Sequence, residues 1–316
     1  MKNALCIVLI PALLIGFLTT VHAAGNHEPL IQVKVAKTAL FDLARRGNGL
    51  VAVGERGVVV KSTDGGKAWT TFPTPTTRTL TSVVFVDDKT LVAAGHGATL
   101  LRSEDAGTSW QAIVVPEIGK DSILGLLATR DGRVIAYGSF GIYIESADAG
   151  KTWQRRTVVK GDFDRHISQV IEVGDKLLLV GESGTLALSP DKGATWSDLK
   201  SAYQGSYFGA LALPDGAMLI FGMRGNIYRS ADGGTSWTHI PIAATSTLNS
   251  GSIDANGRVA LVGNNGLLVT SSDNGLTFAI GHAPEGLPLA SAKFLNDGTL
   301  FYVGYMSTGW IKPVEK

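Results

Sequence analysis

The chain has little of several things that define common protein classes. It holds 1 cysteine among 316 residues, which excludes a disulfide framework. Its 28 basic residues nearly balance its 27 acidic ones, so no net positive charge marks it as a nucleic-acid binder. Charged residues reach only 17%, against roughly 25% in an ordinary soluble domain. What it has is 39 glycines and 45% apolar residues, enough for a large core joined by many turns.

The one long apolar run lies at the N-terminus. Met1-Lys2-Asn3 is followed by the apolar or small stretch Ala4–Val21 and by Val21-His22-Ala23, a small-x-small pattern. This order is typical of a secretory signal peptide. We therefore expect residues 1–23 to be removed, together with the sole cysteine, Cys6, and the single domain 24–316 to be exported to the periplasm or secreted. The alternative is a retained membrane anchor, although Pro11 interrupts the run.

An eight-residue motif recurs through the rest of the chain at steps of 41 or 43 residues. It begins with Ser, carries Asp at its third position and ends in Trp, or in Phe278 in a weaker sixth copy. The Asp residues are Asp64, Asp105, Asp148, Asp191, Asp232 and Asp273, and the Trp residues are Trp69, Trp110, Trp153, Trp196 and Trp237. Such a period indicates a repeat architecture.

The segments between the motifs predict the fold. Each unit of about 42 residues contains four short strand patterns joined by tight turns. A seventh hairpin, with its turn at Asp297-Gly298, follows the last motif. We therefore predict an all-β, seven-bladed β-propeller of four-stranded antiparallel blades. The seventh unit has three strands, so we expect the segment Leu30–Val35 to pair with it as the fourth and close the ring.

We interpret the repeated motif as structural. An Asp two residues before a Gly can accept hydrogen bonds from the amides of its own turn, and the Trp can pack into the blade. Copies one repeat apart lie on different blades, too far apart to share a metal ion. We therefore expect no metal, no cofactor and no catalytic residue in these motifs.

The opposite rim of the ring is the expected recognition surface. It carries the turns between second and third strands and the linkers between blades, which differ from blade to blade and include Arg, His and aromatic residues. Our candidates are Arg56, His96, Phe140, Arg165, His166, Tyr207, Arg224 and Tyr305. The charged linker 160–166 is the first choice for a partner contact. The alternative is that these are ordinary solvated turns.

The motif Ser-x-Asp-x-Gly-x-Thr-Trp is the Asp-box, also called the bacterial neuraminidase repeat. With six consecutive copies and Gly-x-x-Gly turns such as Gly54–Gly57 and Gly181–Gly184, the chain resembles the photosystem II stability/assembly factor family over about residues 30–311. The resemblance implies a chaperone-like module that binds a membrane protein or a subunit of a membrane complex. We expect this module to be non-catalytic and monomeric, without a cofactor. It also implies the thylakoid lumen as location if the host is photosynthetic.

Asp-boxes also occur in sialidases, which use an arginine cluster, a Tyr nucleophile with a Glu, and an Asp acid/base. Residues of these types lie near one face of the predicted ring: Arg56, Arg165, Arg224, Tyr305, Glu55 and Asp42. The Phe/Tyr-Arg-Ile-Pro element that sialidases carry before the first Asp-box is missing, since residues 40–46 read Leu-Phe-Asp-Leu-Ala-Arg-Arg. A sialidase-like glycoside hydrolase or a carbohydrate-binding propeller is therefore the alternative prediction.

Overall fold

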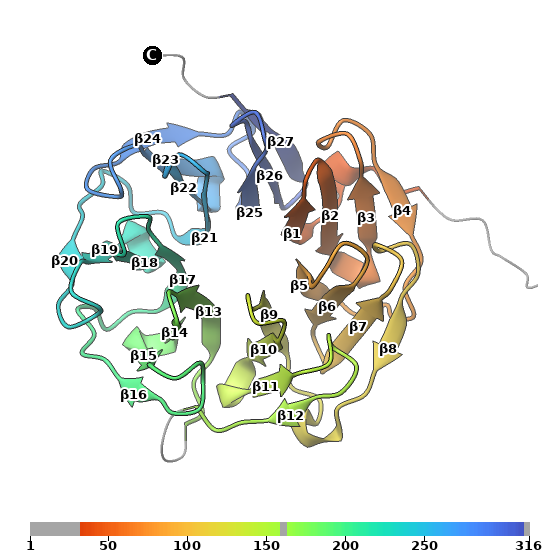
Figure 1. Cartoon of the computed structure of the whole chain (residues 1–316). Coiled ribbons are helices and arrows are strands. Elements are labelled where there is room, and N and C mark those ends of the chain that lie inside the picture. The colour runs from red at the N-terminus through yellow and green to blue at the C-terminus, as the bar shows by residue number, and fades with distance from the viewer. Residues whose placement is uncertain (1–31, 159–162, 313–316) are drawn as a thin grey trace, which may run out of the picture. The chain divides into compact units, whose positions relative to one another are not determined.

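The structure is a ring of antiparallel sheets. The computed structural model describes residues 32–158 and 163–312, in which seven sheets follow one another around a central channel (Figure 1). Six sheets contain four strands and the seventh contains three, and within each sheet the strands keep their chain order. The prediction of an all-β, seven-bladed propeller is confirmed. The predicted signal peptide, residues 1–23, lies outside the described residues.

Each blade begins with its inner strand, next to the channel, and proceeds outward (Figure 1). The first three blades are β1 (Leu40–Arg46), β2 (Gly49–Gly54), β3 (Val59–Ser62), β4 (Thr70–Phe72); β5 (Leu80–Phe85), β6 (Leu91–Gly95), β7 (Thr99–Ser103), β8 (Gln111–Ile113); and β9 (Ile123–Ala128), β10 (Val134–Gly138), β11 (Tyr143–Ser146), β12 (Gln154–Arg155). The next three are β13 (Ile167–Val173), β14 (Lys176–Gly181), β15 (Leu186–Ser189), β16 (Ser197–Asp198); β17 (Tyr207–Ala212), β18 (Met218–Gly222), β19 (Ile227–Ser230), β20 (Thr238–His239); and β21 (Leu248–Ile253), β22 (Val259–Gly263), β23 (Leu267–Ser271), β24 (Ala279–His282). The seventh is β25 (Leu289–Phe294), β26 (Leu300–Gly304) and β27 (Ser307–Ile311).

Short 3₁₀ turns complete the described chain. They are η1 (Val35–Lys37), η2 (Glu55–Gly57), η3 (Pro116–Ile118), η4 (Ser139–Gly141), η5 (Glu182–Gly184), η6 (Met223–Gly225) and η7 (Asn264–Gly266). Five of them, η2 and η4 to η7, are the turns between the second and third strands of a blade.

The core lies between the blades. Second strands such as β6 and β10 are buried at every residue, as expected for strands covered on both faces. Each of the seven interfaces between neighbouring blades has its own hydrophobic cluster. The cluster between the second and third blades, for example, joins Val92 of β6 to Val134 of β10 and Trp153. Burial of apolar surface between blades therefore holds the ring together.

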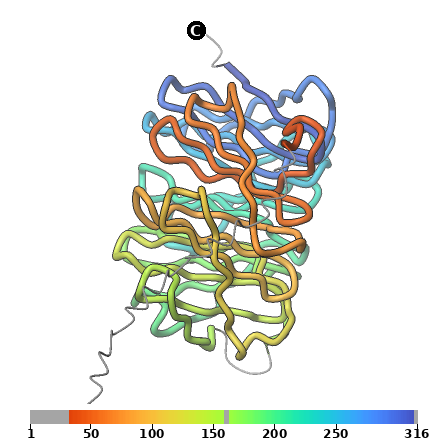
Figure 2. Tube along the Cα trace, turned by 90° about the vertical axis from the view of Figure 1, so that its right-hand side faces the viewer, coloured from red at the N-terminus to blue at the C-terminus, as the bar shows by residue number. Residues whose placement is uncertain are grey.

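The ring closes differently from our expectation of a fourth strand at Leu30–Val35. Leu30 and Ile31 lie outside the described residues, and Gln32 and Val33 instead exchange hydrogen bonds of 3.3 and 3.1 Å with Thr71 of the first blade. Val35 packs in the cluster between the seventh and first blades. Val33 packs against the same cluster, so burial of apolar surface holds this segment against the ring. The first and last blades are neighbours (Figure 2), bridged between Ala39 and Tyr305.

One carboxylate ties three blades together at this closure. Asp42 of β1 accepts hydrogen bonds at Oδ2 from the Ser82 hydroxyl (2.9 Å) and the Val83 N–H (3.0 Å) of the second blade. Its Oδ1 accepts from the Ser291 hydroxyl of the seventh blade (3.0 Å) and from the Leu43 N–H (2.8 Å). The side chain therefore links the first strand of the ring to both neighbours.

The Asp-box forms the turn between third and fourth strands, as predicted. In the third blade the Ser146 hydroxyl donates to Asp148 (2.8 Å) and accepts from the Gly150 N–H (2.8 Å). Asp148 accepts from the Thr152 N–H (2.8 Å), and the Trp153 Nε1–H donates to the Gly150 carbonyl (3.1 Å). In this blade the contacts satisfy the polar groups of the turn itself, which supports the structural interpretation of the motif.

The same turns also join neighbouring blades, which the sequence did not indicate. In four boxes, the backbone carbonyl of the residue after the Asp accepts a hydrogen bond from an Arg or Trp side chain of the preceding blade. The pairs are Arg102 with Ala149 (2.7 Å), Arg133 with Lys192 (2.9 Å), Arg229 with Asn274 (2.9 Å) and Trp310 with Gly65 (2.9 Å).

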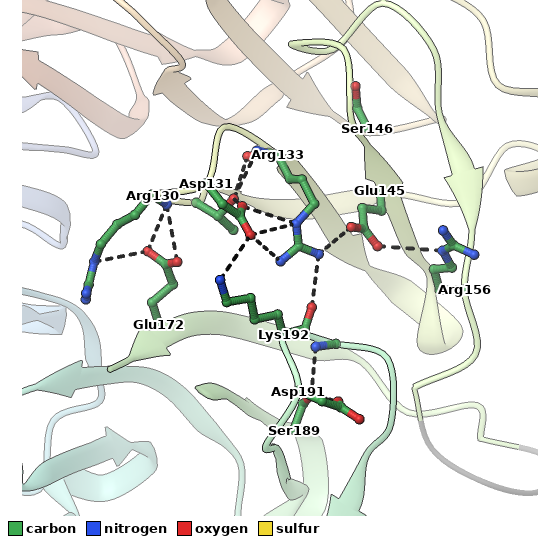
Figure 3. A network of polar contacts seen from close by, with 12 residues as sticks. Arg130, Asp131, Arg133, Glu145, Ser146, Arg156, Glu172, Ser189, Asp191 and Lys192 are labelled. Atoms are coloured by element: carbon green, nitrogen blue, oxygen red, sulfur yellow. Dashed lines mark hydrogen bonds and ion pairs between the residues drawn. The ribbon is translucent and has the colours of Figure 1, made fainter. Parts of the chain in front are cut away.

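Figure 3 shows this contact between the third and fourth blades. Arg133 reaches the Lys192 carbonyl and forms ion pairs with Asp131 and Glu145. Hydrogen bonds from Arg133 and Thr129 lower the pKa of Asp131 to about 2. The arginine is therefore fully compensated within the fold.

Acid is expected to weaken the ring through the Asp-boxes. Hydrogen bonds from the Ser236 hydroxyl and N–H lower the pKa of Asp232 from its usual 3.8 to about 2. A carboxyl whose pKa is lowered by folding stabilises the native state above the unfolded pKa, and this stabilisation is lost as the pH falls from about 4 to about 2. Calorimetry should therefore show the Tm falling through this window. Asp232→Asn should have a lower Tm than the unmodified chain at neutral pH. Its Tm should fall less than that of the unmodified chain when the pH is lowered.

The control is Asp175→Asn, at an exposed residue of the turn between β13 and β14. Its acid profile should follow that of the unmodified chain. Identical profiles for Asp232→Asn and the unmodified chain would contradict the assignment.

Candidate functional site

The two rims of the ring differ in construction. Because neighbouring strands are antiparallel, the first and third turns of a blade lie at one end and the second turn and the linker at the other. The first end, here called the Asp-box rim, carries the six repeated turns. The second end, here called the variable rim, consists of the second turns 55–57, 96–98, 139–141, 182–184, 223–225, 264–266 and 305–306 with the first residues of the inner strands.

Close backbone packing explains the Gly-x-x-Gly sequence of the variable-rim turns. A Cβ on Gly54 would lie 2.1 Å from the Ala39 carbonyl, and one on Gly57 2.1 Å from the Thr76 carbonyl. Gly57 also has a positive φ of 73°, which favours glycine. The two residues between the glycines meet no such restriction on side-chain size, so this turn can differ from blade to blade.

Several arginines of the Asp-box rim pair with carboxylates, whereas three arginines of the variable rim do not. The pairs are Arg46 with Asp88, Arg102 with Glu104, Arg133 with Glu145, Arg229 with Asp215 and Arg258 with Asp254. Arg45, at the same rim, donates instead to the carbonyls of Gly47 and Phe294. On the variable rim, Arg56 and Arg224 form no hydrogen bond or ion pair with any residue that the structure describes. Arg165 has one long hydrogen bond, 3.5 Å, to the Ser183 carbonyl. The variable rim therefore presents uncompensated positive charge.

Large apolar side chains are also exposed on the variable rim. They are Phe41, Phe140, Phe208, Met223, Tyr305 and Met306, with Phe140 54% and Tyr305 55% exposed. Single exposed apolar residues are ordinary on a protein surface, whereas their accumulation on one face makes that face a candidate interaction surface. The variable rim combines this group with its free arginines.

Two cavities open along the ring axis. The larger, about 480 Å³, is the central channel, and the inner strands of all seven blades line it. The second, about 420 Å³, is the cavity at the channel mouth on the variable rim. Its lining residues are Leu124, His166, Ser168, Glu182, Ser206, Phe208 and Asn249.

Most of the predicted contact residues lie on the variable rim. Arg56, Phe140, Arg224 and Tyr305 occupy second turns and are exposed. His96 is exposed as well, with its Nδ1 2.9 Å from the Ser122 hydroxyl of the next blade. No single pocket gathers these five residues, since they come from the first, second, third, fifth and seventh blades.

The linker before the fourth blade brings two further predicted residues to this rim. The Arg165 carbonyl accepts from the Gly141 N–H (2.9 Å), which fixes the end of the linker against the turn of the third blade. His166 lies edge-on to Phe140, with ring centroids 5.1 Å apart, and its Nδ1 is 3.5 Å from Glu182. Residues 160–162, the start of the predicted contact linker, lie outside the described residues.

Tyr207 does not belong to the rim surface, which corrects our prediction. Its side chain is fully buried between the fourth and fifth blades, and its hydroxyl lies 2.9 Å from that of Ser201. Burial raises the pKa of this phenol. Successive residues of a strand point to opposite sides, so the next residue, Phe208, is the one that faces the channel mouth.

The sequence analysis missed two residues that line the central channel, Phe41 and Leu124. Both occupy the second position of an inner strand, where a register shift follows the first residue pair. Phe41 is 39% exposed and Leu124 lines both cavities. Comparison of the inner strands from blade to blade would have found them, because each repeat places one residue at this position.

The residue types that a sialidase uses do not come together in either of these two cavities. The Asp42 carboxylate already accepts four hydrogen bonds from its own and the two neighbouring blades. The Glu55 carboxylate accepts a hydrogen bond from the Ala39 N–H (3.0 Å). Arg56, Arg165 and Arg224 line neither cavity. Across residues 32–158 and 163–312, no group of three His, Cys, Asp or Glu side chains could hold a metal ion, and no helix is long and apolar enough to cross a membrane.

Fold and surface together define the class: a seven-bladed Asp-box propeller with one rim of regular turns and arginine–carboxylate pairs, and one variable rim that exposes arginines and apolar side chains. Residues 128–258, from the end of β9 to the sixth blade, match the family described as Photosynthesis system II assembly factor YCF48. The resemblance indicated by the Asp-boxes and the Gly-x-x-Gly turns is thereby confirmed. None of the curated proteins matches the chain.

Solved structures share the fold at low sequence identity. "YCF48 bound to D1 peptide" superposes with a TM-score of 0.68 at 19% identity, covering 87% of this chain and 92% of that one. YCF48 from Cyanidioschyzon merolae gives 0.66 at 15%, covering 87% and 95%. The WD40 propeller domain of Doa1 gives 0.71 at 14%, covering 90% and 96%. Because propellers of different names superpose equally well, these likenesses establish the fold alone.

Proposed function

We propose that this chain is an exported, non-catalytic propeller whose variable rim binds a subunit of a membrane protein complex during its assembly or maintenance. The observation that carries the proposal is the contrast between the rims. Five arginines of the Asp-box rim pair with carboxylates, whereas Arg56, Arg165 and Arg224 on the variable rim lack a carboxylate partner in the described residues. Charges without an internal partner, set beside exposed aromatic side chains, are the composition of a protein-binding surface.

The family match supports the kind of partner. The similar YCF48 propeller carries a D1 peptide in its structure, and a segment of a membrane protein is the corresponding partner proposed here. Arginine and aromatic side chains suit such a segment because they contact both its polar and its apolar groups. The N-terminal pattern of residues 1–23 supports export, which would place the rim on the same side of the membrane as such a segment.

The test is capture from solubilised host membranes by the tagged chain, expressed from its full sequence and recovered from the cell envelope. Mass spectrometry of the purified chain shows whether residues 1–23 have been removed, as expected after export and signal-peptide cleavage. The unmodified chain should retain a membrane protein, and Arg165→Ala/His166→Ala/Arg224→Ala should retain about tenfold less or none.

The matched control is Lys67→Ala/Lys89→Ala/Lys151→Ala, which removes exposed cations from the Asp-box rim and should capture normally. Equal capture by both triple variants would contradict the assignment of the rim. A folded chain that captures nothing would contradict the proposal and favour the carbohydrate-binding alternative.

A further inference from the structure

The variable-rim turns hold bulky residues in a conformation that disfavours them. The second residue between the two glycines has a left-handed backbone in five blades, with φ of 54° at Arg56, 51° at Phe140, 52° at Ser183, 55° at Arg224 and 57° at Asn265. In the shorter turn of the seventh blade Met306 has a φ of 52°. Apart from glycine, only asparagine and aspartate adopt this region readily. Asn265 is thus the one well-suited residue of the set.

The strain comes from the architecture. In the third blade a Cβ on Gly138 would lie 2.2 Å from the Ser122 carbonyl, and one on Gly141 2.7 Å from the Phe163 carbonyl. Both glycines are therefore fixed by backbone packing, and Phe140 between them must take the left-handed conformation whatever its side chain. An asparagine would fit the same turn with less strain.

The bulky side chains return little to the fold. Arg56 and Arg224 form no polar contact with the described residues. Phe140 and Met306 are 54% and 43% exposed. Phe140 contacts the edge of His166, which lines the mouth cavity. Strained backbone conformations cluster at binding sites, so residues that hold this conformation and make few internal contacts are candidates for binding.

We propose that Arg56, Phe140, Arg224 and Met306 are the recognition residues of the variable rim, and that their side chains contact an extended segment of a partner polypeptide. This inference rests on the proposed function. Phe140 and Met306 call for apolar side chains in that segment, with the mouth cavity beside Phe140 as the place where one of them enters. Arg56 and Arg224 call for acidic ones.

A second copy of this chain fits the rim less well. A symmetric dimer through this face would set the same surface against itself. The uncompensated arginines of one copy would then approach those of the other, which is unfavourable.

The strain and the recognition are tested together by Phe140→Asn and Arg224→Asn, with Ser183→Asn as the matched control at the same turn position. All three should raise the Tm by about 1–2 °C, because asparagine tolerates the left-handed region. Binding is measured by fluorescence anisotropy with short labelled peptides tiled across the water-exposed segments of the captured membrane protein. Phe140→Asn and Arg224→Asn should weaken the best peptide about tenfold, whereas Ser183→Asn should leave it unchanged.

The salt dependence of binding distinguishes the charged contact of Arg224 from the apolar contact of Phe140. The loss caused by Arg224→Asn should shrink as the salt concentration rises, and the loss caused by Phe140→Asn should not. Unchanged peptide binding in both variants would overturn the inference and leave the proposed function standing. A lower Tm in all three would overturn the strain argument. No peptide binding to the unmodified chain would refute the proposed function and this inference with it, and a dimer abolished by Phe140→Asn would make a second copy the occupant.

Discussion

Asp42→Ala is expected to lower the free energy of unfolding by about 3 kcal/mol, because hydrogen bonds to a charged group contribute about 1.5–3 kcal/mol each and are not additive. The carboxylate holds Ser82 and Val83 of the second blade and Ser291 of the seventh. Removing it leaves two buried hydroxyls, those of Ser82 and Ser291, without this acceptor. Urea unfolding followed by circular dichroism measures the loss.

Asp42→Asn should recover only part of the stability, because its amide donates where the Val83 N–H also donates. Asp175→Ala, at an exposed turn on the Asp-box rim, is the control and should stay within about 0.5 kcal/mol of the unmodified chain. A similarly small effect of Asp42→Ala would show that apolar packing alone closes the ring.

Trp153→Ala is expected to cost about 4 kcal/mol, the usual cost of truncating a buried Trp. The ring lies in the cluster between the second and third blades, and its Nε1–H donates to the Gly150 carbonyl. Truncation therefore leaves a cavity at an inter-blade interface and an unsatisfied turn. Because this residue lies far from the variable rim, the folded fraction should still capture the partner. Far-UV circular dichroism is the appropriate probe, since the substitution removes a fluorophore.

Two further variants separate packing from the polar contact. Trp153→Phe keeps an aromatic ring, as Phe278 does in the sixth blade, and should cost about 1 kcal/mol for the lost hydrogen bond. Lys151→Ala changes an exposed residue of the same turn and should be neutral. Unfolding of Trp153→Ala at the same urea concentration as the unmodified chain would refute the structural role of the box.

Substitutions on the two rims are expected to have different effects. On the Asp-box rim, arginines such as Arg102 and Arg229 reach the next blade and pair with carboxylates, so their charges serve the ring. On the variable rim the fixed glycines set the backbone and leave the tips free to differ. Substitutions on the first rim should therefore change the Tm more than capture, and those on the second should change capture more than the Tm.

The repeat predicted the blade number and the Asp-box turns correctly for a physical reason. A box such as Ser146–Trp153 satisfies its own polar groups within eight residues, so its conformation depends on local sequence. The variable rim could be located in the same way, because antiparallel strands alternate their ends. The orientation of single side chains was harder to predict. Tyr207 and Phe208 are adjacent aromatic residues, and only the packing of the fourth blade against the fifth decides which of them is buried.

The sequence by itself thus determined the architecture, since each blade is encoded by contacts within about 42 residues, and it determined the separation of a regular rim from a variable one. Tertiary structure decided how the ring closes, with Asp42 bound to Ser291 at the other end of the chain. It also decided which arginines find a carboxylate and which stay uncompensated. These features depend on contacts between side chains of different blades. Such contacts join residues far apart in the sequence, so a local sequence pattern does not predict them.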